Sequence, residues 1–312
     1  MHYFLGCTSD KIWDYTTLIE FLVDNQKKDI VIELQPEAIC LHNLGLYKIL
    51  DLFQFSKVTI LTNNPLEQHN RYNIIHKDVD IWFGKQHIDS NLHQWNKTKK
   101  FYCLFGRPTA GRLGLGSYIN QHYSKDAHIH FSFPISNDTL HHYELDKLLT
   151  YRVESINDVG NIVSKFPITL STTEKYTAFN GYDYTDPLTE FYKDILVDIV
   201  VESHVSGKTF FPTEKTLRPI WLKKPFIMFA SKDYLCYLRQ MGFRTFSDFW
   251  DEDYDGYEGR DRFNKILKLI DSIANKSFKE LEEMYWAMTY TLDYNYNVLK
   301  NRNWTTNITE VI

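Results

Sequence analysis

The chain has 312 residues, 43% hydrophobic and 24% charged, a balance typical of a folded protein that can bury a sizeable core. Its formal net charge of -5 excludes a protein that holds duplex DNA by overall charge alone, although a local basic groove is still allowed. The sequence has no apolar run long enough for a membrane span and no signal-peptide pattern at its start. Four widely spaced cysteines, without a CxxC pair, predict reduced and mostly buried thiols in a cytoplasmic protein.

Strands and helices alternate through the first ninety or so residues. Short β-branched or apolar runs predict strands, and the segments between them carry apolar residues at helical spacing. The first helix is expected to begin at an Asp10 cap. The predicted strands are 2–6, 29–34, 57–62 and 78–84, and the second predicted helix is 41–53. This alternation predicts βαβ units and a mainly parallel sheet.

A polar stretch at 93–100 reads as a linker, and a second alternating region follows it. Residues 134–190 predict long loops with a helix near 140–152. We therefore predict an α/β fold with two Rossmann-like domains, 1–95 and 96–312, the second of which ends in helices. Ligands of such sheets bind at the carboxyl ends of the strands. The other predicted elements are strands at 101–105, 128–133, 195–203 and 225–230, and helices from Arg112, from Thr213, and at 232–243, 261–275 and 278–299.

The most concentrated group of charges lies in "FFPTEKTLRPIW", at the start of a predicted helix. With Thr213 as N-cap, Glu214 and Lys215 fall in the first turn. Free backbone N–H groups and the positive end of the helix dipole favour a phosphate there, and Lys215 and Arg218 add cations. Glu214 can accept hydrogen bonds from ribose hydroxyls. The alternative is an amphipathic surface helix whose charges face water.

Two further positions suit an anionic ligand. The loop in "CLFGRPTAGR" lacks the Walker A and GxGxxG patterns, but its small residues let a ligand approach the backbone. Arg107 and Arg112 flank it and can each bind two phosphate oxygens, unless they pair with local carboxylates. Glu202 closes an almost wholly apolar strand, where a carboxylate needs a partner or a ligand, although an exposed sheet rim is the alternative.

No metal site is predicted. The triplet Asp251-Glu252-Asp253 has the DxD spacing that holds a divalent metal in one class of sugar-transferring enzymes, but its aromatic loop context favours an acidic turn. His128 and His130 alternate along one strand without a third ligand at a suitable spacing.

The order "KKFYCLFGRPTAGR", "DIVVES" and "FFPTEKTLRPIWLKKPFI" resembles the donor-binding half of fucosyltransferase-type glycosyltransferases. Together with "YLRQMGFRTFSDFWDEDYD" it is also similar to glycosyltransferase-like proteins encoded by bacteriophages. The resemblance covers roughly residues 97–265. The chain departs from the family at Glu202-Ser203-His204, where Glu-Asn-Ser is usual, and this leaves the selection of base and sugar open.

The resemblance implies a metal-independent, inverting glycosyltransferase of the two-Rossmann (GT-B) type that uses a UDP- or GDP-sugar. Arg107 or Arg112 would hold the diphosphate together with Lys215, and Glu214 would bind the ribose. A glycan or a modified base in bacteriophage DNA would be the acceptor, in the cytoplasm of a host cell. We expect Glu33 as the catalytic base because it lies at a strand end, with Glu37 as the alternative. The competing hypothesis is a non-catalytic nucleic-acid-binding or assembly protein with the same fold. The aromatic content and the basic segments "KKFYCLFGR" and "TLRPIWLKK" support it.

Overall fold

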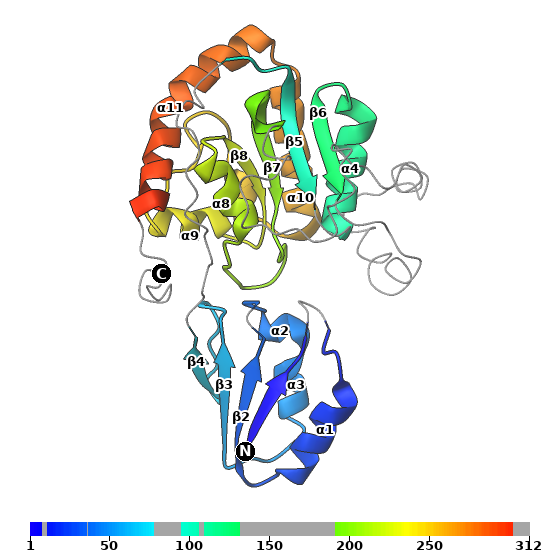
Figure 1. Ribbon diagram of the computed structural model, residues 1–312. Helices are drawn as coiled ribbons and strands as arrows, with labels where there is room; N and C mark the ends of the chain where they lie inside the picture. Colours follow the sequence, from blue (N-terminus) through cyan, green and yellow to red (C-terminus); the bar gives the residue numbers. More distant parts are fainter. Residues whose placement is uncertain (8–10, 36, 78–94, 106–108, 132–190, 302–312) are drawn as a thin grey trace. The chain divides into compact units, whose positions relative to one another are not determined.

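The computed structural model describes residues 1–301 apart from 8–10, 36, 78–94, 106–108 and 132–190 (Figure 1). The described chain forms two compact units. The first contains residues 1–77 and the segment Ser206–Phe211, and the second contains residues 95–205 and 212–301. The domain boundary at residue 95 stays a prediction.

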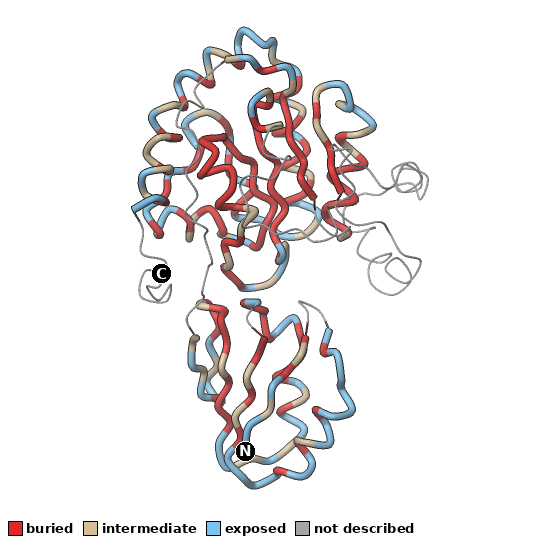
Figure 2. The backbone as a smooth tube through the Cα atoms, in the orientation of Figure 1, coloured by how far each residue is buried: buried red, intermediate tan, exposed pale blue. Residues whose placement is uncertain are grey.

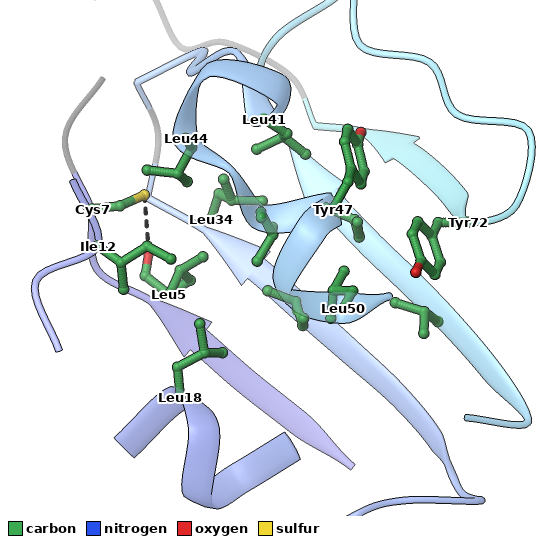
Figure 3. Packing of buried hydrophobic residues seen from close by; sticks show 14 of the residues in the cluster. Leu5, Cys7, Ile12, Leu18, Leu34, Leu41, Leu44, Tyr47, Leu50 and Tyr72 are labelled. Carbon is green, nitrogen blue, oxygen red and sulfur yellow. Dashed lines mark hydrogen bonds between the residues drawn. The ribbon is translucent and has the colours of Figure 1, made fainter. Parts of the chain in front are cut away.

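The first unit is built on a parallel sheet with the strand order β1-β2-β3-β4. Three helices lie between its first three strands in the sequence, and buried side chains of helices and strands pack into one hydrophobic core (Figure 3). The elements are β1 (His2–Leu5), α1 (Tyr15–Asp24), β2 (Asp29–Leu34), α2 (Leu41–Leu44), α3 (Leu46–Leu50), β3 (Lys57–Thr62) and β4 (Asn73–His76).

Two helix predictions in this unit were wrong in their bounds. The first helix begins at Tyr15 and not at Asp10, because Asp14 is the N-cap and accepts a hydrogen bond from the Thr17 N–H at 3.0 Å. The single helix predicted at 41–53 is two short helices. They meet at Gly45, whose φ of 76° is left-handed and ends the first of them.

The second unit contains a parallel sheet with the strand order β6-β5-β7-β8. The path β5–α4–β6 runs outward from the centre in one direction, and β7–α8–β8 runs outward in the other. Right-handed connections therefore place α4 and α8 on opposite faces, and the order reverses between β5 and β7. The strands are β5 (Lys99–Phe105), β6 (Ala127–Phe131), β7 (Ile195–Val201) and β8 (Phe226–Phe229).

Helices cover this second sheet, and every residue of β7 and β8 is buried (Figure 2). Tyr118 and Tyr123 of α4 each donate a hydrogen bond to Oδ1 of Asp271 in α10, and α11 packs against α8. The helices are α4 (Ala110–Tyr123), α8 (Glu214–Trp221), α9 (Tyr234–Gln240), α10 (Gly259–Ala274) and α11 (Phe278–Asn301), with a short 3₁₀ helix η2 (Asp253–Gly256).

The predicted fold class is confirmed: two parallel four-stranded sheets, each flanked by helices, are followed by C-terminal helices. The strand at 78–84 and the helix near 140–152 lie outside the described residues. All four cysteines are free, and Cys236 alone of them is partly exposed. Within the described ranges, none of the helices has the length and apolar composition needed to cross a bilayer.

Candidate functional site

The reversal of strand order in the second unit lies between the carboxyl ends of β5 and β7. Open α/β sheets bind ligands in the crevice that such a reversal creates. Thr109 precedes α4 beside the end of β5, and Thr213 caps α8 after β7. Arg112 joins the two regions, because its Nη2 donates a hydrogen bond to the carbonyl of Val201 at 3.1 Å. Most of the predicted binding residues therefore gather at one end of one sheet.

Glu202 is almost fully buried immediately after β7 and caps the start of α8. Its Oε1 accepts hydrogen bonds from the Thr213 N–H at 3.0 Å and the Thr216 hydroxyl at 2.6 Å. Its Oε2 accepts from the Thr213 hydroxyl at 2.7 Å. A carboxylate at this place is favoured by the positive end of the helix dipole. Glu202 therefore has partners within the chain and positions the turn that carries Glu214 and Lys215.

Lys215 folds back over this turn. Its Nζ lies 2.7 Å from Oε1 of Glu214, 3.0 Å from Oγ1 of Thr213 and 3.3 Å from Oγ of Ser203. Burial disfavours the charged form of Glu214, but the Lys215 ammonium, its hydrogen bond, a backbone hydrogen bond and the charge of Arg218 together hold the pKa of the carboxyl below its usual value. The site thus presents a cation and a carboxylate side by side at the start of a helix, an arrangement suited to a phosphate and a ribose hydroxyl.

Arg218 lies one turn further along α8 and is buried in a separate polar cluster. Its Nε donates a hydrogen bond to the Tyr192 hydroxyl at 2.7 Å, and that hydroxyl also donates to Asp198 in the middle of β7. Burial raises the pKa of Asp198 to about 6, although Arg218 opposes the shift. Burial lowers the pKa of His130 to about 4, and the positive charge of Arg218 contributes to this shift. Arg218 therefore acts first as the counter-charge of Asp198 inside the unit.

Sequence reasoning missed Tyr192 and Asp198 as partners of Arg218. Asp198 carried a signal, because it is a single carboxylate within the apolar run "ILVDIVV". Nothing in the sequence around Tyr192 marked it. Ser203, which contacts the Lys215 ammonium, was named only as a departure from the family pattern.

The predicted base Glu33 lies in the first unit, one residue before the end of β2. Its carboxylate binds Nζ of Lys77 and lies 3.0 Å from Nε2 of His2. The hydrogen bond from Lys77 holds the pKa of Glu33 below its usual value, which makes the carboxylate a weaker base. The assignment of Glu33 stays a prediction, as does that of the exposed Glu37. Arg107 lies outside the described residues.

The acidic turn is accounted for by contacts within the second unit. Oδ1 of Asp251 accepts the Asp253 N–H at 2.9 Å, and Asp253 binds the ammonium of Lys265. Asp255 accepts the N–H of Leu235 at the start of α9 at 3.0 Å. Across the described ranges, no group of three or more histidine, cysteine or acidic side chains is placed to hold a metal ion.

No protein-family model matches the chain, and neither the curated proteins nor the solved structures contain a match to it. Evidence for the function of this chain therefore comes from its fold and from the residues where the strand order of the second sheet reverses.

Proposed function

We propose that the protein is a nucleotide-sugar-dependent glycosyltransferase of the two-Rossmann (GT-B) type. The observation that carries the proposal is the Lys215 ammonium, held at the first turn of α8 where the strand order of the second sheet reverses. A cation at the start of a helix and at such a reversal suits a nucleoside diphosphate. Glu214, 2.7 Å away, supplies the acceptor that a ribose hydroxyl needs.

The reaction proposed is a direct displacement with inversion. An acceptor oxygen forms a bond to the anomeric carbon while the bond to the nucleoside diphosphate breaks, and a carboxylate takes the acceptor proton. Negative charge grows on the leaving diphosphate, and Lys215 offsets it without a metal ion. Arg112 keeps the end of β7 beside the start of α4. Glu33 or Glu37 is the proposed base, a UDP- or GDP-sugar the donor, and a glycan or a modified DNA base the acceptor.

Substituting Lys215 by alanine tests the binding role. We expect Lys215→Ala to weaken UDP or GDP binding by about 10- to 100-fold, because one charge-assisted hydrogen bond contributes about 1.5–3 kcal/mol. Turnover should fall further, by about 10²-fold or more, because the charge on the leaving group grows in the transition state. Isothermal titration calorimetry with each nucleotide and a donor-hydrolysis assay measure the two effects.

Lys279→Ala is the matched control, because Lys279 is an exposed lysine of the same unit in the first turn of α11. It should bind nucleotide as the wild type does. If Lys215→Ala binds UDP and GDP with wild-type affinity, the diphosphate role of Lys215 is wrong. If neither nucleotide stabilises the wild-type protein against heating, the transferase proposal fails as a whole.

A further inference from the structure

Lysines gather at the amino-terminal edge of the second sheet, the edge opposite the candidate site. A lysine lies in the connector that leads into each of its four strands, and two more lie around the turn between α10 and α11. The lysine pairs of the two basic segments, at 99–100 and 223–224, thus lie at the edge opposite the Lys215 turn. The lysines are Lys97, Lys99 and Lys100 before or within the start of β5, Lys125 before β6, Lys193 before β7, Lys223 and Lys224 before β8, and Lys276 and Lys279.

Hydrogen bonds tie these connectors together in space. Nζ of Lys97 donates to the carbonyl of Lys193 at 2.6 Å. Nζ of Lys99 donates to the carbonyl of Lys125. Each bond holds the ammonium of one lysine against the backbone of another. The amino-terminal ends of β5, β6 and β7 therefore share one positively charged edge.

The turn between α10 and α11 joins the same edge. Nζ of Lys100 donates to the carbonyl of Ala274, the last residue of α10, and lies 5.6 Å from the ring centre of Phe278. Phe278 begins α11 between Lys276 and Lys279, and its side chain is 38% exposed. A partly exposed aromatic ring therefore lies among the cations.

We use the name lysine rim for the five lysines of this edge that are exposed or partly exposed: Lys99, Lys125, Lys193, Lys276 and Lys279. Three carboxylates accompany them in the same connectors: Asp126, Asp194 and Glu280. Asp194 already accepts a hydrogen bond from the Thr98 hydroxyl at 2.7 Å and contacts His128 at 3.2 Å. The rim is thus net positive on a chain whose formal charge is -5.

Two buried lysines, Lys97 and Lys224, lie behind the rim. Lys224 is almost fully buried, and its Nζ lies 6.0 Å from the ring centre of Tyr285. Burial, and after it the adjacent ammonium of Lys97, hold the pKa of Lys224 well below its usual value. The charged form of these buried amines is disfavoured, so the positive charge of this edge is carried mainly by the exposed lysines of the rim.

We propose that the lysine rim, with Phe278, is a docking surface for single-stranded nucleic acid. Phosphates would be bound by the rim lysines, and one unpaired base would stack on the exposed face of Phe278. The strands that separate the amino-terminal edge from the carboxyl-terminal edge are up to seven residues long. The rim therefore lies about 20 Å from the place where the strand order reverses. This docking surface is separate from the proposed nucleotide-sugar site and does not depend on it.

Fluorescence anisotropy with a labelled twelve-nucleotide oligothymidylate at 50 and 200 mM salt tests the proposal. We expect binding that weakens with salt. Lys125→Glu combined with Lys193→Glu should weaken it at least tenfold and reduce the slope of log K against log salt by about 1.4. Lys48→Glu combined with Lys300→Glu is the control, because it makes the same charge change at exposed lysines of α3 and α11 that do not belong to the rim.

Phe278→Ala should weaken binding by about tenfold through the lost stacking, whereas Phe278→Tyr should retain it. The proposal is overturned if the wild type does not bind the oligonucleotide at 50 mM salt, or if both double variants lose affinity equally. Equal binding of polyglutamate, or an unchanged affinity of Phe278→Ala, also overturns the assignment to single-stranded nucleic acid. UDP and GDP binding of the rim variants should equal that of the wild type, so the two proposals can fail independently.

Discussion

Buried charged side chains of the second unit differ in the partner that accompanies them. Arg262 pairs with Asp255 at 3.1 Å, and Arg218 lies in the cluster with Asp198, so these charges are compensated. The charge that acts most strongly on Lys224 is the like charge of Lys97, which Asp194 opposes more weakly. In the described part of the chain no hydrogen-bond acceptor contacts its Nζ. A buried amine without a hydrogen-bond partner destabilises the fold.

Replacing Lys224 by methionine should therefore stabilise the protein at neutral pH. The folded-state pKa of Lys224 lies well below its unfolded value of 10.5, so the unfolded chain binds more protons than the folded chain at pH values between these two. This penalty is present below the folded pKa and disappears as pH rises to about 10.5. Lys224→Met should therefore raise the unfolding free energy at pH 7 by about 1–3 kcal/mol, which appears as a higher Tm. The gain should be smaller at pH 10.

Thermal unfolding of wild type and variant at pH 7 and pH 10 measures this difference. Lys279→Met is the control at an exposed position and should leave the Tm unchanged at both values. A Lys224→Met variant that is less stable than the wild type at pH 7 would show that the amine has a compensating partner.

The starts of helices in this protein depend on both near and distant residues. Asp14 caps α1 and Thr213 caps α8 through N–H groups two or three residues away. Asp233, which precedes α9, makes no side-chain cap, and Asp255 supplies the acceptor from twenty residues further along the chain. The packing of a helix likewise depends on contacts with other elements, such as the contact of α4 with β8.

Gly111, in the first turn of α4, has room for no side chain. A Cβ there would lie 2.7 Å from Cε1 of Phe229, a fully buried ring in β8. We expect Gly111→Ala to lower the free energy of unfolding by about 1–3 kcal/mol, because neither the helix nor the packed ring can move without strain. A denaturant or thermal unfolding series measures the loss.

Gly256→Ala is the matched control, because among the described residues, apart from the two chain neighbours, no atom lies within 4 Å of a Cβ built at Gly256. It should change stability by less than about 1 kcal/mol, since the substitution mainly restricts the unfolded chain. Equal effects of the two substitutions would mean that the contact with Phe229 does not limit α4.

The chain passes between its two units more than once. After Val205 it returns to the first unit for six residues, Ser206–Phe211, and re-enters the second at Pro212. Nδ2 of Asn64 donates a hydrogen bond to the carbonyl of Lys208 at 2.9 Å, and the Thr209 hydroxyl donates to the carbonyl of Ala38. The first unit is therefore completed by a segment distant in sequence.

Gly207→Ala should loosen this segment. The φ of Gly207 is 82°, and a Cβ there would lie 2.9 Å from Cβ of Cys40 and would also collide with the side-chain amide of Asn43. Gly242→Ala separates backbone strain from steric contact, because Gly242 has a φ of 91° but, apart from its chain neighbours, no atom of the described residues within 4 Å of its Cβ position. We expect Gly207→Ala to lower the unfolding free energy by about 1–3 kcal/mol more than Gly242→Ala does. Thermal unfolding of both variants measures the difference, and equal losses would contradict the packing of Gly207 against the first unit.

Much of the fold could be predicted because its signals are local. β-branched runs such as "DIVIEL" and "ILVDIVV" marked strands, and Thr213 marked the start of α8. The break at Gly45 and the late start of α1 were missed because caps and left-handed residues shift helix ends by a few positions without changing the apolar pattern. For the candidate site, the sequence predicted the turn of Glu214 and Lys215. It did not predict that Glu202 would bind the start of α8 or that Ser203 would contact the Lys215 ammonium.

The sequence by itself determined the alternation of strands and helices, the parallel sheets and the position of the charged helix start, because each depends on residues within about one or two turns of each other. Only the tertiary structure decided that Glu202 caps α8, that Arg218 meets Asp198, and that Lys100 reaches the carbonyl of Ala274, 174 residues away. These partners are chosen by the folded path of the chain, which brings together residues whose separation in sequence carries no periodic signal.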